Sequence, residues 1–238
     1  MRVLLLAAGF GTRLAPLTNT IPKCLVPIAG RPLLDYWLDL LAQAGLHEVL
    51  INLHYLPEQV EAYVSTVSYP LHITLVREAE LLGTGGTILK NRDFFKGGPG
   101  MVVHADNLSL FDVKAFVKRF ETRDRDIDMT MMTFQTDAPQ TCGIVATDAR
   151  GVVRAFHEKQ PNPPGNNANA AVYIISPAVM EFIAGLDQEK VDLSTEVLPH
   201  FLGRMNTFDN TIYHRDIGTP ESLARAQAEF PAVYRAFH

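Results

Sequence analysis

The stretch LLLAAGFGTRLAPLTNTIPKCLVPIAG, residues 4–30, decides how the rest of the sequence is interpreted. It begins as an apolar strand and becomes a long loop with three glycines, three prolines and two cations, Arg13 and Lys23. Hardly any carboxylate balances the two cations within this stretch. A loop of this charge directly after a buried strand indicates that an anion lies against it.

The segment AAGFGTR, residues 7–13, allows four interpretations. A dinucleotide-binding turn requires G-x-G-x-x-G at the start of a helix, but position 14 is Leu and three prolines follow. The G-x-x-x-x-G-K-[ST] spacing of a phosphate loop is absent. A simple turn would use Gly9 and Gly11 only for positive φ. An open phosphate clamp would use glycine N–H groups, the planar fork of Arg13 and the point charge of Lys23.

The first half of the chain shows an alternation of strands and helices that predicts an α/β fold. Apolar runs predict strands over 2–7, 48–54, 71–77, 101–104 and 128–135. Helical spacing and end signals predict helices over 32–45, 57–67, 85–90 and 112–121. Strands and helices in this order imply right-handed βαβ units and a mostly parallel sheet.

The second half departs from that alternation. A D-A-R-G turn inside residues 142–159 predicts a hairpin, followed by strands over 170–175 and 207–214 and helices over 177–184, 194–202 and 220–229. No linker or internal repeat is present. The sequence therefore predicts a single domain over 1–238. It would be a three-layer α/β/α fold of Rossmann-like topology, with a mostly parallel mixed sheet and an inserted antiparallel hairpin.

Composition excludes several classes of protein. The formal net charge is -5 and the pI is about 5.9, which argues against nonspecific nucleic-acid binding. Cys24 and Cys142 are too few for a disulfide scaffold and lack metal-ligand spacing. No run approaches the roughly 20 apolar residues of a membrane helix. We therefore expect a cytoplasmic protein that binds neither nucleic acid nor membrane.

The segments LAAGFGTRLAPLT and PKCLVPIAGRPLL resemble the signature of the sugar-1-phosphate nucleotidylyltransferases, also called NDP-sugar pyrophosphorylases. The departure from the pattern is Cys24, where proline is usual. The resemblance continues through LLGTGGTI (81–88), VVHADN (102–107), CGIV (142–145), FHEKQPNP (156–163), NAAVYI (169–174), DLSTEVLPHFL (192–202) and DIGTPESL (216–223). It is strongest towards the mannose- and heptose-1-phosphate guanylyltransferases, and it implies the nucleotide-diphospho-sugar transferase fold.

The reaction implied by this resemblance is attack of a sugar 1-phosphate oxygen on the α-phosphorus of a nucleoside triphosphate, with release of pyrophosphate. Charge neutralisation and in-line positioning would supply most of the catalysis. Arg13 and Lys23 would be the catalytic residues. Asp106 and Asp216 each follow a predicted strand, and the resemblance assigns both to Mg²⁺. The alternative for each acid is a loop aspartate that caps a following helix.

The nucleotide side of the implied site uses the opening loop and the LLGTGGTI segment. The loop contributes Ala7, Ala8, Gly9, Gly11 and Thr12, and Gly83 and Thr84 would pass beside the base and ribose. Glu78 has the spacing at which guanylyl enzymes carry a guanine-reading glutamate, although Glu80 or a plain surface role is the alternative. GTP is therefore the expected nucleotide, and a uridylyl or thymidylyl enzyme is the second choice.

The sugar side of the implied site comes from the later motifs. The resemblance assigns Gly143, Glu158, Lys159 and Asn169 to the sugar phosphate, with Glu196 either on a sugar hydroxyl or capping a helix. Ala171 stands where the family has glycine. The expected substrates are an NTP and a manno-configured hexose or heptose 1-phosphate. A non-catalytic sensor of nucleotide sugars is the alternative from another class, and a homodimer is left open.

Overall fold

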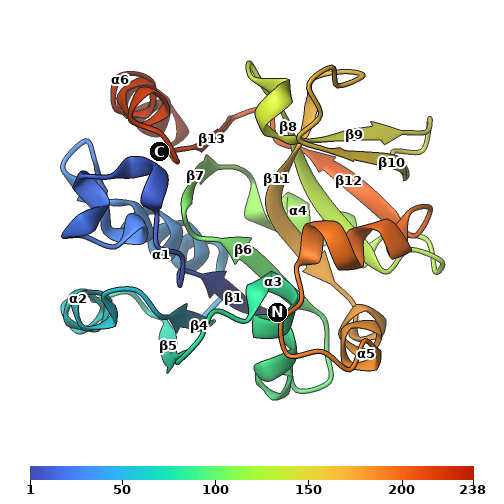
Figure 1. Cartoon of the computed structure of the whole chain (residues 1–238), viewed down its shortest axis with the longest axis horizontal. Helices are drawn as coiled ribbons and strands as arrows, with labels where there is room; N and C mark the ends of the chain where they lie inside the picture. The colour runs from blue at the N-terminus through green and yellow to red at the C-terminus, as the bar shows by residue number, and fades with distance from the viewer. The chain divides into compact units, whose positions relative to one another are not determined.

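A computed structural model describes all 238 residues, and the chain divides into two compact units. Figure 1 follows the chain from its blue N-terminus to its red C-terminus. The first unit comprises Arg2–Leu81, Val103–Val113 and Ile212–His238, and the second comprises Met1, Leu82–Val102 and Lys114–Thr211. None of the helices combines the length and the apolar character needed to cross a bilayer.

The first unit is built on parallel strands joined by helices. Its strands lie in the order β6 (Gly100–His104), β1 (Arg2–Leu6), β4 (Glu48–Leu53) and β5 (His72–Arg77), and the division between the units falls within β6. The pairs β1–β4 and β4–β5 are parallel. Between these strands the chain forms α1 (Leu33–Ala44), which ends at Gly45 with φ 79°, and α2 (Pro57–Val64), with Pro at its first turn. The expected βαβ arrangement is confirmed here.

The C-terminal part of the chain differs from expectation in two places. The predicted strand over 207–214 is wrong, because this segment divides between β12 (Met205–Asp209) and β13 (Tyr213–Asp216), which belong to different sheets. The predicted last helix is too short, since α6 (Pro220–Phe237) continues through Pro231. Aromatic contacts hold the extension in place: the rings of Phe230 and Tyr234 lie 4.9 Å and 5.1 Å from that of Tyr36. Packing here outweighs the proline's lost hydrogen bond.

The second unit contains the antiparallel part of the fold. Strand β8 (Met129–Gln135) pairs antiparallel with β11 (Asn167–Ile175) and parallel with β12. The expected hairpin is β9 (Gly143–Thr147) and β10 (Val153–Glu158), and it pairs with β11 through β9. The helices are α3 (Gly83–Lys90), α4 (Val113–Glu121, which begins at the unit boundary) and α5 (Pro177–Gly185). A mixed α/β sheet with a mostly parallel core and antiparallel strands is thus confirmed.

The segment expected as a helix over 194–202 is instead two short turns. Leu193–Val197 forms one π-helical turn and Leu198–Phe201 one 3-10 turn. Pro199 lies inside the predicted range, and an interior proline removes the hydrogen bond that a regular α-helix would make there. The expectation of a continuous helix is therefore wrong, although the segment is helical in type.

Strand β11 carries a bulge that places an alanine in a glycine-like conformation. The pairing register with β8 shifts between Asn169 and Tyr173, and Ala171 inside this shift has φ 54°. A left-handed conformation costs an L-residue roughly 1–2 kcal/mol, which exceeds the roughly 0.5–1 kcal/mol of extra backbone entropy that a glycine loses. Ala171 is only partly buried, so its methyl group contributes little to the core.

We predict that Ala171→Gly raises the free energy of unfolding, by up to about 1 kcal/mol, because it relieves this backbone strain. The measurement is urea denaturation at equilibrium. Ala168→Gly is the control in the same strand: Ala168 is fully buried, and its replacement should lower stability. Equal losses in both variants would contradict the strain assigned to Ala171.

Candidate nucleotide and metal site

The loop of residues 7–26 is wound into three short 3-10 turns, Thr12–Leu14, Leu17–Asn19 and Lys23–Leu25. Gly11 enters the first turn with φ 65°. A Cβ on Gly11 would lie 3.1 Å from both the Cβ of Lys23 and the Cγ2 of Thr18, and the Thr18 hydroxyl donates to the Gly11 carbonyl over 2.8 Å. Gly11 is therefore required by the backbone and by the close approach of the segment that carries Lys23.

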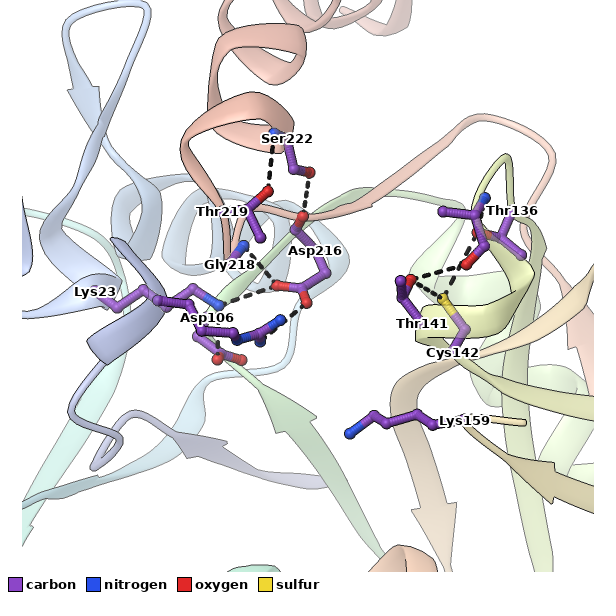
Figure 2. A network of polar contacts seen from close by, with 12 residues as sticks. Lys23, Asp106, Thr136, Thr141, Cys142, Lys159, Asp216, Gly218, Thr219 and Ser222 are labelled. Atoms are coloured by element: carbon purple, nitrogen blue, oxygen red, sulfur yellow. Dashed lines mark hydrogen bonds and ion pairs between the residues drawn. The ribbon is translucent and has the colours of Figure 1, made fainter. Parts of the chain in front are cut away.

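Lys23 is a buried cation held between two carboxylates. Its side chain is 5% exposed, and its Nζ donates to Asp106 Oδ2 over 2.9 Å and to Asp216 Oδ1 over 3.1 Å (Figure 2). The two carboxylates are 41% and 45% exposed. The ammonium group thus lies beneath a pair of acids that solvent can reach.

A short antiparallel pair explains why the two acids meet. Asp106 lies in the turn between β6 and β7 (Asn107–Leu110), and β7 pairs with β13 so that Asn107 is opposite Asp216. Asp106 therefore precedes the residue that faces Asp216. Because a strand follows Asp106, the alternative that it caps a helix is wrong.

Asp216 is also not the cap of α6. That role belongs to Thr219, whose hydroxyl accepts from the N–H of Ser222 over 3.2 Å (Figure 2). The Asp216 carboxylate instead accepts from the N–H of Gly218 over 2.8 Å. The Ser222 hydroxyl donates to the Asp216 backbone carbonyl. The start of α6 thus fixes Asp216 from both its backbone and its side chain.

Arg13 reaches the same carboxylate from the glycine loop. Its Nη2 lies 3.3 Å from Asp216 Oδ2, while its side chain remains 65% exposed. A Cβ on Gly218 would lie 2.6 Å from that Nη2 and 2.8 Å from Asp216 Oδ1. Gly218 therefore makes room for this contact. Gly218 is not among the predicted site residues, although the D-I-G-T segment after a strand is a signal for it.

The charges at this site are balanced and mutually stabilising. Burial acts to lower the pKa of Lys23, but Asp106 and Asp216 outweigh it and the pKa is raised overall. Burial acts to raise the pKa of Asp216, but Lys23, Arg13 and the Gly218 N–H lower it below its ordinary value. The nearby His214 has its pKa lowered by burial to about 3, which leaves the ring neutral. Two cations therefore face two carboxylates.

The donor set at this site fits Mg²⁺. This ion takes oxygen ligands and is usually held by one or two carboxylates together with phosphates and water. Asp106 and Asp216 supply two carboxylates that lie within 3.1 Å of one shared nitrogen and are partly open to solvent. No group of three or more His, Cys, Asp or Glu side chains is arranged to hold a metal. A site made of two acids leaves the remaining ligand positions to a substrate.

The beginning of the loop combines fixed and open backbone. Ala7 and Ala8 are buried, and the Ala7 N–H donates to Asn52 Oδ1 over 2.9 Å. A Cβ on Gly9 would meet no atom within 4 Å. The protein's own packing therefore does not require glycine at position 9, in contrast to position 11.

The structure separates the two candidate base-reading acids. Glu78 is 3% exposed and Glu80 is exposed. The backbone of Glu78 is fixed by Leu53, whose carbonyl accepts its N–H over 2.7 Å, and by His54, whose Nδ1 donates to its carbonyl over 2.8 Å. The His54 ring packs edge-on against Phe10 of the glycine loop at 5.3 Å. Glu78 is thus in one connected layer with that loop.

In the second unit, the glycines at the start of α3 are used for close packing. A Cβ on Gly83, which has φ 73°, would lie 2.4 Å from the carbonyl oxygen of Val191, and one on Gly86 would lie 2.3 Å from that of Glu189. The Thr84 hydroxyl accepts from the Leu193 N–H over 2.7 Å. These glycines let the 189–193 segment pack directly on the helix start, a constraint that no local sequence pattern indicates.

The hairpin end of the second unit brings Gly143, Glu158 and Lys159 together. A Cβ on Gly143 would lie 2.7 Å from Glu158 Oε2, and Glu158 Oε1 pairs with Lys159 Nζ at 3.2 Å. Lys159 has φ 45°, and its N–H donates to the carbonyl of Cys142 over 3.2 Å. The Cys142 sulfur lies 3.6 Å from the hydroxyls of Thr136 and Thr141 (Figure 2).

Asn169 and Glu196 both have structural partners. The Asn169 amide donates to Tyr173 Oη over 2.6 Å and accepts from the Ala171 N–H over 2.9 Å, so it braces the β11 bulge. Glu196 Oε2 accepts from the Asp192 N–H over 2.6 Å, while Asp192 accepts from the Thr195 N–H over 2.9 Å. This reciprocal arrangement matches the capping alternative for Glu196.

The chain matches known proteins along almost its whole length. It is 34% identical over 229 residues to a mannose-1-phosphate guanylyltransferase of Mycobacterium tuberculosis, covering 94% of this chain and 63% of that protein. The chain thus spans somewhat less than two thirds of the curated relatives it matches. A structure of HddC from Yersinia pseudotuberculosis complexed with GMP-PN aligns with a TM-score of 0.80 at 27% identity, covering 96% and 99% of the two chains.

A more distant structure shows the same fold. The apo form of a UDP-glucose pyrophosphorylase aligns with a TM-score of 0.81 at 20% identity, covering 98% of each chain. The model of one family, described as nucleotidyl transferase, matches residues 2–232. With the glycine loop, its two cations and the paired acids in place, this chain belongs to the nucleotidyl transferase family.

Proposed function

We propose that this protein transfers a nucleotidyl group from a nucleoside triphosphate to a sugar 1-phosphate. The observation that carries the proposal is the cluster of Arg13, Lys23, Asp106 and Asp216 beside a glycine loop. Family membership supports the reaction type, and the names of the relatives support a sugar 1-phosphate as the acceptor class. A sugar-phosphate oxygen would bond to the α-phosphorus as the bond to pyrophosphate breaks.

The chain's own groups would neutralise charge in this reaction. Arg13 is 65% exposed, and its guanidinium fork would bind the leaving pyrophosphate in place of Asp216. Lys23 would neutralise charge on the α-phosphate in the transition state. The open Cβ side of Gly9 suits close approach of phosphate oxygens to the backbone. Asp106 and Asp216 would hold Mg²⁺, which would polarise the phosphates and align them.

The nucleotide we propose is GTP. Glu78 is the buried one of the two candidate acids, and a carboxylate accepts well from the N1–H and N2–H₂ edge of guanine. The relatives named as mannose-1-phosphate guanylyltransferases, and the HddC structure with GMP-PN, support the same choice. A uridylyl or thymidylyl enzyme remains the second candidate, since a UDP-glucose pyrophosphorylase shares the fold.

The acceptor we propose is a manno-configured hexose or heptose 1-phosphate. Lys159, paired with Glu158 at the hairpin end, would bind its phosphate, and Glu158 and Gly143 would face its sugar. Asn169 and Glu196 would support the sugar-binding residues indirectly. Asn169 stabilises the β11 bulge, and Glu196 stabilises the turn that begins at Asp192. A cytoplasmic location remains a prediction from the sequence, and a homodimer remains open. A non-catalytic sensor is disfavoured because it has no need of both metal-binding acids.

The decisive experiment is a pyrophosphate-release assay with the four common NTPs against a panel of sugar 1-phosphates. We expect pyrophosphate release only when one nucleotide, one sugar phosphate and Mg²⁺ are present together. Pyrophosphate release with GTP and mannose 1-phosphate or a manno-heptose 1-phosphate would support the specific assignment. Binding of nucleotide sugars with no turnover on any pair would support the sensor instead.

The first prediction concerns the two acids. Asp106→Asn and Asp216→Asn should each lower kcat at least about a hundredfold, because each removes one of the two charged ligands proposed for Mg²⁺. Asp93→Asn is the matched control, since Asp93 is fully exposed and lies outside this cluster. Near-normal turnover of both acid variants at limiting Mg²⁺ would remove the metal assignment. Circular dichroism should show that all three variants are folded.

The second prediction concerns the base. Glu78→Gln should lower kcat/KM for GTP and narrow the gap to UTP, because lost pairing at a buried polar edge costs about 1–3 kcal/mol, or roughly ten- to a hundredfold. Glu80→Gln is the control, because Glu80 is exposed and two residues away. If the wild-type enzyme prefers UTP or dTTP with one sugar phosphate held constant, the guanine assignment fails while nucleotidyl transfer stands.

A further inference from the structure

The position of the Lys23 ammonium has a consequence for metal binding. The group lies between Asp106 Oδ2 and Asp216 Oδ1, at 2.9 Å and 3.1 Å, and is far less exposed than either carboxylate. Two carboxylates this close repel each other unless a cation lies between them. Lys23 supplies such a cation through its contacts with both acids.

A metal ion shared by the two acids would compete with Lys23 for their negative charge, because the Lys23 ammonium contacts one oxygen of each carboxylate. The same ion would also meet the guanidinium of Arg13, which contacts Asp216 at 3.3 Å. Two protein cations against two carboxylates leave no net negative charge to attract a divalent ion. The arrangement therefore opposes binding of the metal on its own.

A polyphosphate would change this balance. Its negative charge would attract both cations, and the carboxylate oxygens released in this way would become available to the metal. Lys23 is placed for such a move by its own loop, because Gly11 allows the Lys23 segment to lie against the glycine turn. The nucleotide and the metal would then bind cooperatively.

We infer that Lys23 is the resident counter-ion of Asp106 and Asp216 and exchanges with Mg²⁺ at these carboxylates when a polyphosphate binds. The inference rests on the proposed function, since it uses the metal and the polyphosphate that nucleotidyl transfer requires. It adds that Lys23 competes with the metal for the two acids and keeps their side chains in position.

The test is thermal unfolding of the full chain in EDTA and in millimolar MgCl₂ at matched ionic strength. Lys23→Met keeps the length and volume of the buried stem but removes the charge, so its Tm in EDTA should fall. Millimolar MgCl₂ should then raise the Tm of this variant by at least about 3 °C, because the uncompensated acids bind the ion. The wild type should shift by less than about 1 °C under the same conditions.

Two further variants separate the specific effect from a general one. Lys118→Met removes the charge of an exposed lysine on α4 and should behave like the wild type. The double variant Lys23→Met with Asp106→Asn should lose the stabilisation by MgCl₂, since one of the two acids is gone. If Lys23→Met does not fold, Lys23→Gln takes its place, because its amide can still donate to a carboxylate.

The wild-type protein alone can also contradict the inference. Stabilisation of the wild type by MgCl₂ as large as that of Lys23→Met would show that Lys23 does not compete with the metal. Absence of any MgCl₂ effect on the Tm of both Lys23→Met and Lys23→Gln would likewise overturn the inference. Adding pyrophosphate should make the wild-type Tm respond to MgCl₂ by more than the separate effects of the two ligands.

Failure of the exchange and failure of the proposed reaction would give different results. Turnover in the pyrophosphate-release assay together with equal MgCl₂ shifts in all proteins would leave nucleotidyl transfer standing and reject the exchange. A selective shift in Lys23→Met without turnover on any substrate pair would support the exchange at the carboxylates and reject the transfer reaction.

Discussion

One buried ammonium group links three segments of the first unit that are far apart in the sequence. Lys23 contacts Asp106 and Asp216, which are 83 and 193 residues away along the chain. Each of the three residues is positioned by a different local element. Lys23 lies in a 3-10 turn after Pro22, Asp106 in a turn before β7, and Asp216 at the end of β13. Burying an unpaired charge costs free energy, so the three elements stabilise one another only when all of them are formed.

Helix α6 supports the same arrangement from the C-terminal side. Its first turn fixes Asp216, and one turn and a half later the Gln227 side chain accepts from the Ala29 N–H over 2.7 Å and donates to the Pro27 carbonyl over 2.6 Å. The hairpin of β2 (Pro27–Ile28) and β3 (Arg31–Pro32) follows Lys23 directly. The helix therefore holds both the acid and the strand that follows the lysine, which gives the last part of the chain a role at the site.

The sequence predicted the parallel part of the fold because periodic apolar runs there coincide with clear end signals, as at Gly45. It also brought Asp106 and Asp216 into one hypothesis, through motifs. It could not show how they meet, because β7 and β13 are short and partly polar and their pairing joins residues more than 100 positions apart. The predicted strand over 207–214 failed for a related reason: alternation continues across a turn at Asn210, whose N–H donates to Thr133. The packing of Val191 on the α3 glycines was beyond any local pattern.

The two glycines of the opening loop carry information of different kinds. Gly11 has a positive φ and close neighbours, so the chain itself demands it. Gly9 has open space where a side chain would begin, since a Cβ there would meet no atom within 4 Å. In a library of variants, substitutions at Gly11 should lower the cellular abundance of the protein. Substitutions at Gly9 should instead lower growth that depends on its activity. The two positions thus separate a constraint that the fold imposes from one that only a bound molecule could impose.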